Sequence, residues 1–329
     1  MSTKLDDIDK KLVGLLQGDF PLSAEPFSAL GEQLGINGEQ IIDRIEKLKR
    51  DGIVRLIGPV FDARKLGYQT TLVVMRVAES GLDRAAEVLD GHPGVSHAYE
   101  RNHNLNLWFT LVLPPDVDMY GELQRLKDLI NAEAVVDLPA LRMFKIGAYF
   151  DVQDDSHSLS GIGIDYGRRL AGGSRLSAAD RELINTLGRD IPLVQRPFDA
   201  ASARLGVEVD QLLDRLGSLK KRGVMRRFGA AINHYGVGYM ANAMACWIAA
   251  PDRVAAAGKK LSAFQEVSHC YERKTNPLWP YNLFAVIHGH TKEVCEEIAG
   301  KVSSEVGLED YVLLFSTREL KKTRVNYKV

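Results

Sequence analysis

The chain has 329 residues, more than a single hydrophobic core usually holds, which predicts about two to four domains. Its 42 Lys and Arg residues nearly balance 43 Asp and Glu residues, and the formal charge of -1 excludes the broad basic surface typical of nucleic-acid-binding proteins. Cys246, Cys270 and Cys295 have neither metal-ligand spacing nor a haem-attachment motif, which indicates buried, reduced thiols.

The chain shows no signal for export or for membrane insertion. Residues 1–10 contain no apolar segment of a signal peptide. No stretch approaches the roughly 18 uninterrupted apolar residues that span a bilayer. We therefore expect a cytoplasmic protein without a membrane contact.

The second half of the chain repeats the first at an offset of 171 residues, which places Phe27 on Phe198. After one extra residue, VSHAYER at 95–101 aligns with VSHCYER at 267–273, with six identities in seven positions. Residues 152–175 between the copies are rich in Gly, Ser and Asp without a sustained period, which predicts a linker. The sequence thus predicts an internal pseudo-dimer.

Each copy begins with a helical pattern, for which Asp6 and Ser177 are the expected N-caps. In the first copy a helix over 27–34, a turn and a helix over 39–50 follow, and Gly52 is the expected left-handed stop. The next ten residues, IVRLIGPVFD, predict a strand pair, as in a winged helix-turn-helix. The remainder predicts strands over 70–77, 95–101, 106–113 and 141–150 and helices over 82–89 and 119–130.

That order is βαββαβ, the signature of a ferredoxin-like unit. The predicted fold class is therefore α+β, a tandem repeat of a winged helix-turn-helix and a ferredoxin-like domain. The predicted domains are 1–60 and 61–151 in the first copy, the linker, and 176–231 and 232–329 in the second.

This architecture resembles the Lrp/AsnC regulators, which implies a DNA-binding sensor of small amino acids. The second helix of each helix-turn-helix argues against DNA binding, because carboxylates stand where phosphates and base edges would lie. They are Glu39, Asp43, Glu208, Asp210 and Asp214. We therefore interpret the helix-turn-helix as a packing and dimerisation element.

The strand over 95–101 carries the most distinctive side chains. Strict alternation would place Val95, His97, Tyr99 and Arg101 on one face, and the second copy repeats the pattern. Imidazole, phenol and guanidinium groups are costly to bury against helices, so they suit an open sheet face that binds a planar polycarboxylate. The alternative is a polar seam between the copies.

Several motifs resemble the two subunits of the siroheme decarboxylases, here in fused form. They are YERNHNLNLWF (99–109), HCYER to IHG (269–289), GVMRRFGA (223–230), LPALRMFKI (138–146) and FSTRELKK (315–322). The resemblance covers nearly all of both copies. It implies a carboxy-lyase that removes the C12 and C18 acetate carboxyls of siroheme without an oxidant, giving 12,18-didecarboxysiroheme for haem d1 or haem synthesis.

With that resemblance, the residues receive expected roles. The candidate catalytic residues are His97, His103, Tyr99, His269 and Tyr271, and the candidate substrate-binding residues are Arg101, Arg273, Arg226, Arg227 and His234. His97, His103 and His269 are also candidate ligands of the iron in bound siroheme. No further cofactor and no intrinsic metal are expected.

The expected partners are siroheme and its product, without nucleic acid. A further homodimer and contacts with other haem d1 enzymes are compatible with the resemblance. His103, which aligns with Thr275, is expected to make the copies inequivalent, because threonine cannot replace a titrating imidazole. Two alternatives remain open: a DNA-binding regulator, and a haem carrier or sensor without turnover.

Overall fold

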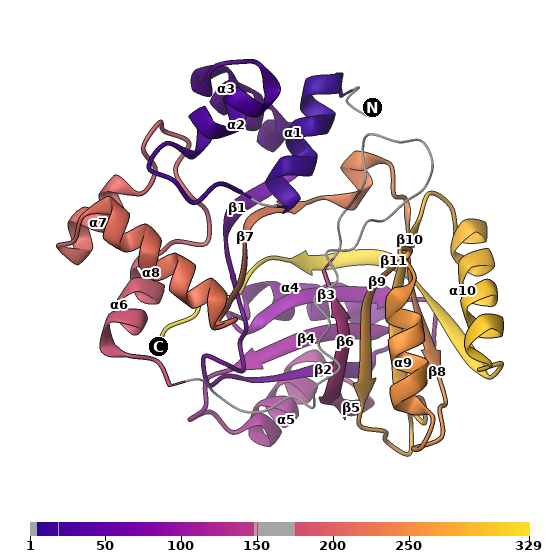
Figure 1. Cartoon of the computed structure of the whole chain (residues 1–329). Coiled ribbons are helices and arrows are strands. Elements are labelled where there is room, and N and C mark those ends of the chain that lie inside the picture. Colours follow the sequence, from indigo (N-terminus) through magenta and orange to yellow (C-terminus); the bar gives the residue numbers. More distant parts are fainter. Residues whose placement is uncertain (1–4, 19, 148–149, 151–174) are drawn as a thin grey trace.

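The computed structural model describes residues 5–18, 20–147, 150 and 175–329, so all but the last residue of the predicted linker at 152–175 lies outside the described residues. The described chain forms two helix-turn-helix units, a two-stranded ribbon and one large sheet (Figure 1). None of its described helices has the length and apolar character needed to cross a membrane.

The two helix-turn-helix units start and stop where the capping residues predict. Asp6 Oδ1 accepts from the Asp9 amide at 2.7 Å, and Ser177 forms a capping box with Asp180. Gly52 has a φ of 71°, which confirms the left-handed stop. The helices are α1 (Asp7–Gly18), α2 (Pro26–Leu34), α3 (Gly38–Arg50), α6 (Ala178–Thr186), α7 (Asp199–Leu205) and α8 (Val209–Lys221).

The ribbon joins the copies. Strands β1 (Val54–Phe61) and β7 (Met225–Ile232) pair antiparallel, and Gly58 lies opposite its own repeat equivalent, Gly229. The predicted strand pair therefore forms between the copies, and a strand pair within 53–62 is wrong. Position 58 in the ribbon has room only for glycine, because a Cβ on Gly58 would lie 2.3 Å from the Arg189 carbonyl oxygen.

The two ferredoxin-like units form one continuous sheet of nine strands in the described chain, in the order β5-β2-β4-β3-β11-β8-β10-β9-β6. The first-copy elements are β2 (Gln69–Arg76), η1 (Glu79–Gly81), α4 (Leu82–Gly91), β3 (Val95–Arg101), β4 (Leu107–Leu113), α5 (Met119–Ile130), β5 (Ala134–Leu138) and β6 (Ala140–Ile146). The second-copy elements are η2 (His234–Val237), β8 (Ala241–Trp247), α9 (Val254–Ala263), β9 (Val267–Arg273), β10 (Leu283–Gly289), α10 (Lys292–Val306) and β11 (Tyr311–Lys322).

The copies exchange their last strands. The first part of β11 pairs with β8, and its second part crosses to β3 of the first copy. In return, β6 pairs with β9 of the second copy. The strand predicted over 141–150 is present as β6, although it ends at Ile146, and β5 on the other side of Pro139 is an element that the sequence pattern did not reveal. Proline has no amide hydrogen for a ladder, and the change of partner strand occurs there.

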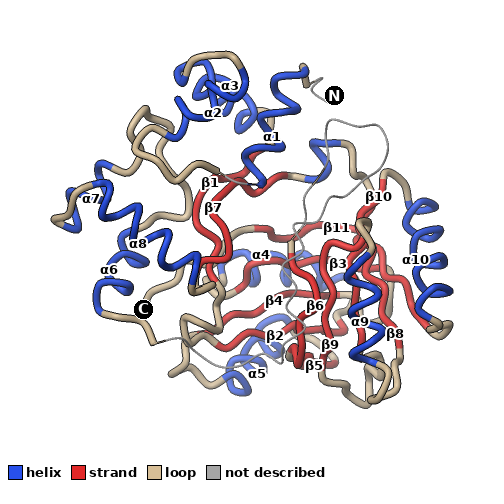
Figure 2. Tube along the Cα trace, in the orientation of Figure 1, coloured by secondary structure: helices blue, strands red, loops and turns tan. Residues whose placement is uncertain are grey.

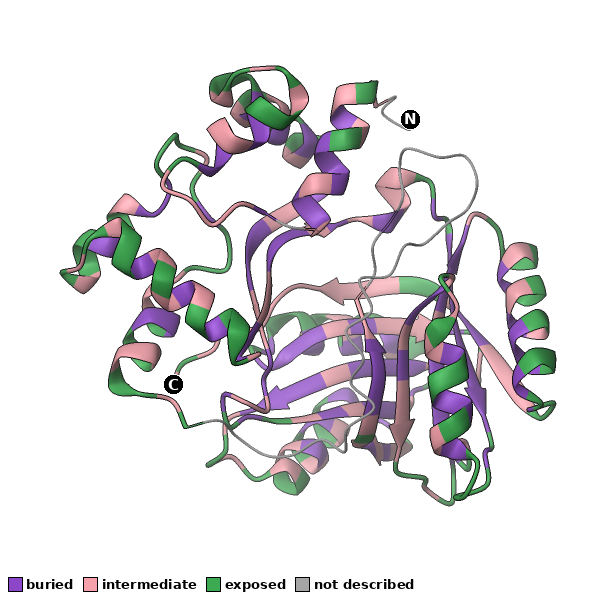
Figure 3. Cartoon of the chain, viewed as in Figure 1, coloured by how far each residue is buried: buried purple, intermediate pink, exposed green. Residues whose placement is uncertain are grey.

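Helices α4, α5, α9 and α10 cover the outer face of the sheet (Figure 2). A separate cluster that includes Trp108, Trp279, Met244 and Phe284 fills part of the opposite face, which we call the inner face. A further core joins both helix-turn-helix units to the ribbon, so these units share one packing interface. Buried positions follow the strands and the helix faces that cover them (Figure 3).

Candidate active site

The polar stripe on β3 faces inward. Tyr99 lies opposite Trp108, which belongs to the inner-face cluster, and His97 lies opposite Thr110. Val95 instead lies opposite Leu111 and packs with the outer helices, since the register shifts between Val95 and His97. The expectation that Val95 shares the face of His97 is therefore wrong, because a β-bulge breaks the alternation.

The equivalent strand β9 behaves in the same way. Its register shifts between Val267 and His269, and Val267 joins the core beneath α9 and α10. His269 and Tyr271 face inward opposite Val286 and Phe284. The two stripes therefore become two pseudo-equivalent faces of one sheet. We call the region of β3 and β11 the first face, and that of β9 and β6 the second face.

Strand β11 completes the first face with two charged side chains. Lys322 lies opposite His97, and Glu319 lies opposite Tyr99. Arg55 of the ribbon forms an ion pair with Glu319, with 2.6 Å between Nη2 and Oε1. Its Nη1 also donates to the Lys322 carbonyl oxygen at 3.4 Å. The first face is therefore built from both copies and from the ribbon.

His234 of η2 lies against this face and is fully buried. Its Nδ1 is 3.1 Å from Lys322 Nζ, whereas its Nε2 has no hydrogen-bond partner among the described residues. The ring stacks on Phe150 at 6.0 Å between centroids and lies 5.3 Å from the buried His288. A buried Nε2 without a partner is costly unless a ligand contacts it.

Two arginines end the stripes in equivalent settings. Arg101 Nη1 donates to the Leu314 carbonyl oxygen at 2.8 Å, and Arg273 Nη1 donates to the Leu138 carbonyl oxygen at 2.9 Å. Burial lowers the pKa of each to about 10, so both remain cations at neutral pH. Neither forms an ion pair with an acidic side chain in the described part of the chain, and both Nε atoms are buried without a partner there.

The second face has different chemistry. Met143 lies opposite Tyr271 and Ile146 lies opposite His269, at the places that Glu319 and Lys322 occupy on the first face. Arg226, the repeat equivalent of Arg55, pairs with Asp62 at 2.9 Å. The second face thus keeps its arginines but has no ammonium group opposite its histidine.

Burial sets the protonation states of the stripes. Desolvation, with Lys322 next in importance, lowers the pKa of His97 to about 3 and that of His269 to about 4. The pKa of His234 is lowered to about 3 for the same reasons. Desolvation raises the pKa of Tyr99. At neutral pH the faces therefore present neutral imidazoles, protonated phenols and cationic guanidinium groups.

Two of the predicted site residues lie elsewhere. Arg227 donates to the backbone carbonyls of Gln17 at 3.0 Å and Ala230 at 3.2 Å, which fixes α1 to the ribbon. His103 Nδ1 accepts from the Leu105 amide in the β3–β4 turn, and its ring packs edge-on against Trp279 at 5.4 Å. His103 therefore contacts the inner-face cluster from the turn that follows β3.

Four residues on or beside the first face were not among the candidates that the sequence indicated. Arg55 has the repeat offset of Arg226, so the alignment of the copies contained a signal for it. Glu319 and Lys322 lie in the motif FSTRELKK, and His288 lies in IHG, yet nothing in those motifs shows which strand they face.

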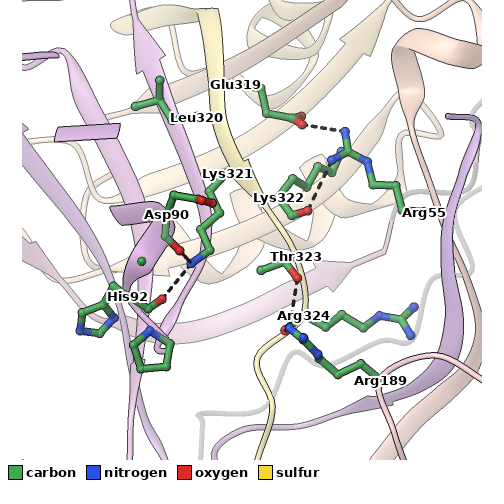
Figure 4. A pocket seen from close by; sticks show the side chains of 12 residues that line it. Arg55, Asp90, His92, Arg189, Glu319, Leu320, Lys321, Lys322, Thr323 and Arg324 are labelled. Atoms are coloured by element: carbon green, nitrogen blue, oxygen red, sulfur yellow. Dashed lines mark hydrogen bonds and ion pairs between the residues drawn. The ribbon is translucent and has the colours of Figure 1, made fainter. Parts of the chain in front are cut away.

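A cavity of about 500 Å³ adjoins the first face and is lined by Arg55, Glu319 and Lys322 from one side. Figure 4 shows these side chains with the Arg55–Glu319 ion pair. A smaller cavity of about 160 Å³ is lined by His97 and shares Arg324 with the first. No group of three or more His, Cys, Asp or Glu side chains that could hold a metal ion occurs in the described residues.

Comparisons with known proteins identify the two kinds of domain and the relatives of the chain. The model of the siroheme decarboxylase NirDL-like helix-turn-helix domain matches residues 9–55 and 180–226, and that of the AsnC-like ligand binding domain matches 65–145 and 236–321. Siroheme decarboxylase from Hydrogenobacter thermophilus is 39% identical over 320 residues, 96% of this chain and 94% of the relative. The siroheme decarboxylase NirDL subunit from Paracoccus denitrificans is 30% identical over 95% of each chain.

Two solved structures share the whole architecture. A crystal structure of the siroheme decarboxylase NirDL has a TM-score of 0.70 at 36% identity, over 98% of this chain and 95% of that chain. NirDL in complex with an iron-uroporphyrin III analogue has a TM-score of 0.69 at 34% identity over the same shares. The repeated Lrp/AsnC-like fold, the two inner faces and these likenesses lead to one conclusion: the chain belongs to the siroheme decarboxylase family, in the form that fuses both halves.

Proposed function

We propose that the chain removes the carboxyl groups of the C12 and C18 acetates of siroheme and releases 12,18-didecarboxysiroheme. The observation that supports this most directly is the pair of buried arginines, Arg101 and Arg273, which lack acidic partners among the described residues. A buried guanidinium group is costly unless an anion accompanies it. A macrocycle with peripheral carboxylates supplies such anions, and the two stripes lie on one continuous sheet.

The reaction needs a proton and no electrons. Loss of CO2 breaks the bond between the carboxyl carbon and the acetate methylene and leaves an electron pair on the methylene carbon. The conjugated ring of the substrate delocalises this pair, and one proton then converts the methylene into a methyl group. Arg101 and Arg273 would position peripheral carboxylates, while neutral His97 and protonated Tyr99 would line the reacting acetate as uncharged groups.

The iron belongs to the substrate, and we propose that no other cofactor is required. The fully buried setting of His234 and the inward stripes would also keep bulk water away from a reacting acetate, which would favour loss of its carboxylate as neutral CO2. Arg55 of β1 and Arg226 of β7 would fix the ribbon beside the bound substrate, one in each half of the chain.

Anaerobic incubation with siroheme tests this function. The expected result is a pigment lighter by two CO2 units, measured by mass spectrometry, without nicotinamide, flavin or added metal. Denatured protein is the control. A pigment that binds with a visible spectral change but keeps its mass would indicate a carrier or sensor. A strict need for an oxidant would contradict the non-oxidative reaction.

The regulator alternative remains testable. Glu39 accepts from Gln195 Nε2 at 3.2 Å, and Glu208 is the N-cap of α8, so acidic groups occupy the start of both would-be recognition helices. Selection from random DNA duplexes at physiological salt is expected to recover no defined site.

Analytical ultracentrifugation, with and without siroheme, would establish whether a further homodimer forms.

A further inference from the structure

The structure carries one asymmetry that the family membership does not explain. His97 and His269 are repeat equivalents, but only His97 lies opposite a lysine, Lys322, because Ile146 takes that place opposite His269. The same lysine contacts His234, whose repeat equivalent is Ala63. One face therefore has an ammonium–imidazole pair, and the other has an isoleucine and an alanine.

We propose that Lys322 is a positioning residue that holds His234 in its Nε2–H form and supplies a proton to Nδ1 when Nε2 donates its own, so that proton delivery belongs to the first face alone. This inference rests on the proposed decarboxylation. An ammonium group can only donate, so the 3.1 Å contact makes Nδ1 of His234 the acceptor and leaves the ring proton on Nε2. That Nε2 is the buried atom without a partner among the described residues.

The proton transfer balances along this pair. After CO2 leaves, the methylene carbon takes the proton of His234 Nε2, and Nδ1 takes a proton from Lys322 at the same time. The imidazole stays neutral in its other form, and Lys322 becomes a neutral amine. After the product leaves, a solvent proton reaches Nε2 and Nδ1 gives its proton back to Lys322, which restores the Nε2–H imidazole and the ammonium group. No oxidant or reductant takes part.

The position of Lys322 allows its ammonium group to equilibrate with solvent before each turnover. His234 is fully buried, whereas Lys322 lines the cavity of about 500 Å³ and is only partly buried. Figure 4 shows Lys322 beside Arg55 at this cavity. The neighbouring Lys321 differs, because its Nζ donates to the carbonyl oxygens of Leu89, Asp90 and His92 and so closes the end of α4.

Desolvation, opposed by Glu319 and assisted by Arg55, lowers the pKa of Lys322 to about 8. The charged and titratable groups around it come from β1, β3, η2, β9, β10 and β11. They are Arg55, His97, His234, His269, His288 and Glu319. Its ammonium form therefore predominates at neutral pH and can release a proton near that pH, unlike the guanidinium group of an arginine.

The test measures single-turnover rates and siroheme dissociation constants of the full chain between pH 6 and 10. The wild-type rate is expected to be flat below pH 8 and to fall about tenfold per pH unit above it. Lys322→Arg keeps the charge and the donor but does not release a proton. It should bind siroheme as the wild type does and react roughly 100-fold more slowly. Its rate should no longer fall as the pH rises above 8.

Two further variants separate a relay from a structural role. Lys322→Ala should recover activity when ethylamine is added, whereas Lys321→Met should keep the wild-type rate per folded molecule. A fully active Lys322→Arg, or Lys322→Ala that ethylamine does not rescue, would overturn the relay. Failure of the wild type to decarboxylate siroheme at all would instead overturn the proposed function.

Discussion

His97 lies directly opposite Lys322 on the β3–β11 ladder, whereas its repeat equivalent His269 lies opposite Ile146. The exchange of last strands between the copies creates both pairs, and so each face contains residues of both halves. Duplication thus produced two sheet faces of the same geometry, and substitutions on the exchanged strands made their chemistry different.

Arg55→Met is expected to destabilise the protein, because it leaves Glu319 largely buried without its ion-pair partner. The expected loss is about 1.5 to 3 kcal/mol of unfolding free energy, the range for a hydrogen bond to a charged group. Urea titration followed by circular dichroism measures it. The double variant Arg55→Met/Glu319→Gln should recover part of the loss. An Arg55→Met variant as stable as the wild type would refute the pairing.

Arg101→Met and Arg273→Met should each weaken siroheme binding by about 1.5 to 3 kcal/mol, or roughly 10- to 100-fold. Each substitution removes a buried cation that has no acidic partner among the described residues. Absorbance titration with siroheme measures the dissociation constants. Arg318→Met is the matched control, since Arg318 forms an exposed pair with Asp83 on the outer side. Unchanged affinity in both variants would remove the arginines from the substrate site.

His103→Ala distinguishes the sequence-based role from the structural one. A positioned acid at 103 predicts a loss of roughly 100-fold in single-turnover rate. The structure, with His103 packed on Trp279 in the turn, predicts an unchanged rate and about 1 kcal/mol less stability from the lost turn hydrogen bond. Rate and urea midpoint are measured on the same preparation, and a slow but stable variant would restore the catalytic assignment.

The buried histidines predict acid sensitivity. The native pKa values of His97 and His234 are about 3 and that of His269 is about 4, against 6.5 for an exposed imidazole. Only the unfolded chain takes up these protons between pH 6.5 and 4, so stability falls as the pH drops through that window.

Each such histidine should lower the unfolding free energy by about 2 kcal/mol between pH 7 and pH 5. Urea unfolding at several pH values measures the slope, and His97→Gln should reduce it. A slope that His97→Gln leaves unchanged would show that His97 takes up its proton equally in both states.

Much of the fold could be predicted from local patterns. The caps at Asp6 and Ser177, the stop at Gly52 and the bounds of β3 and α5 follow from residues that act on their own neighbours. The β-bulge before His97 could not be predicted, because it depends on the register with β4. The exchange of β6 and β11 depends equally on contacts between distant segments.

Only those site residues that occur in both copies of the repeat could be predicted from the sequence. The alternation within the two matching heptapeptides is enough to place His97, Tyr99 and Arg101 on one face of a strand. Lys322 lies far from His97 in sequence, and only the β3–β11 pairing brings them together. His234 lies in the short helix η2, and its repeat equivalent in the first copy is an alanine, so the comparison of the copies gave no signal for it.

The central claim is a non-oxidative decarboxylation in which the protein delivers one proton to each new methyl group. Anaerobic turnover of siroheme in D2O, followed by high-resolution mass spectrometry and NMR of the pigment, tests it directly. The account predicts loss of two CO2 units and one deuteron in each of the two methyl groups formed from the C12 and C18 acetates. An unchanged pigment mass, a requirement for an oxidant, or carboxyl loss from other ring positions would contradict it.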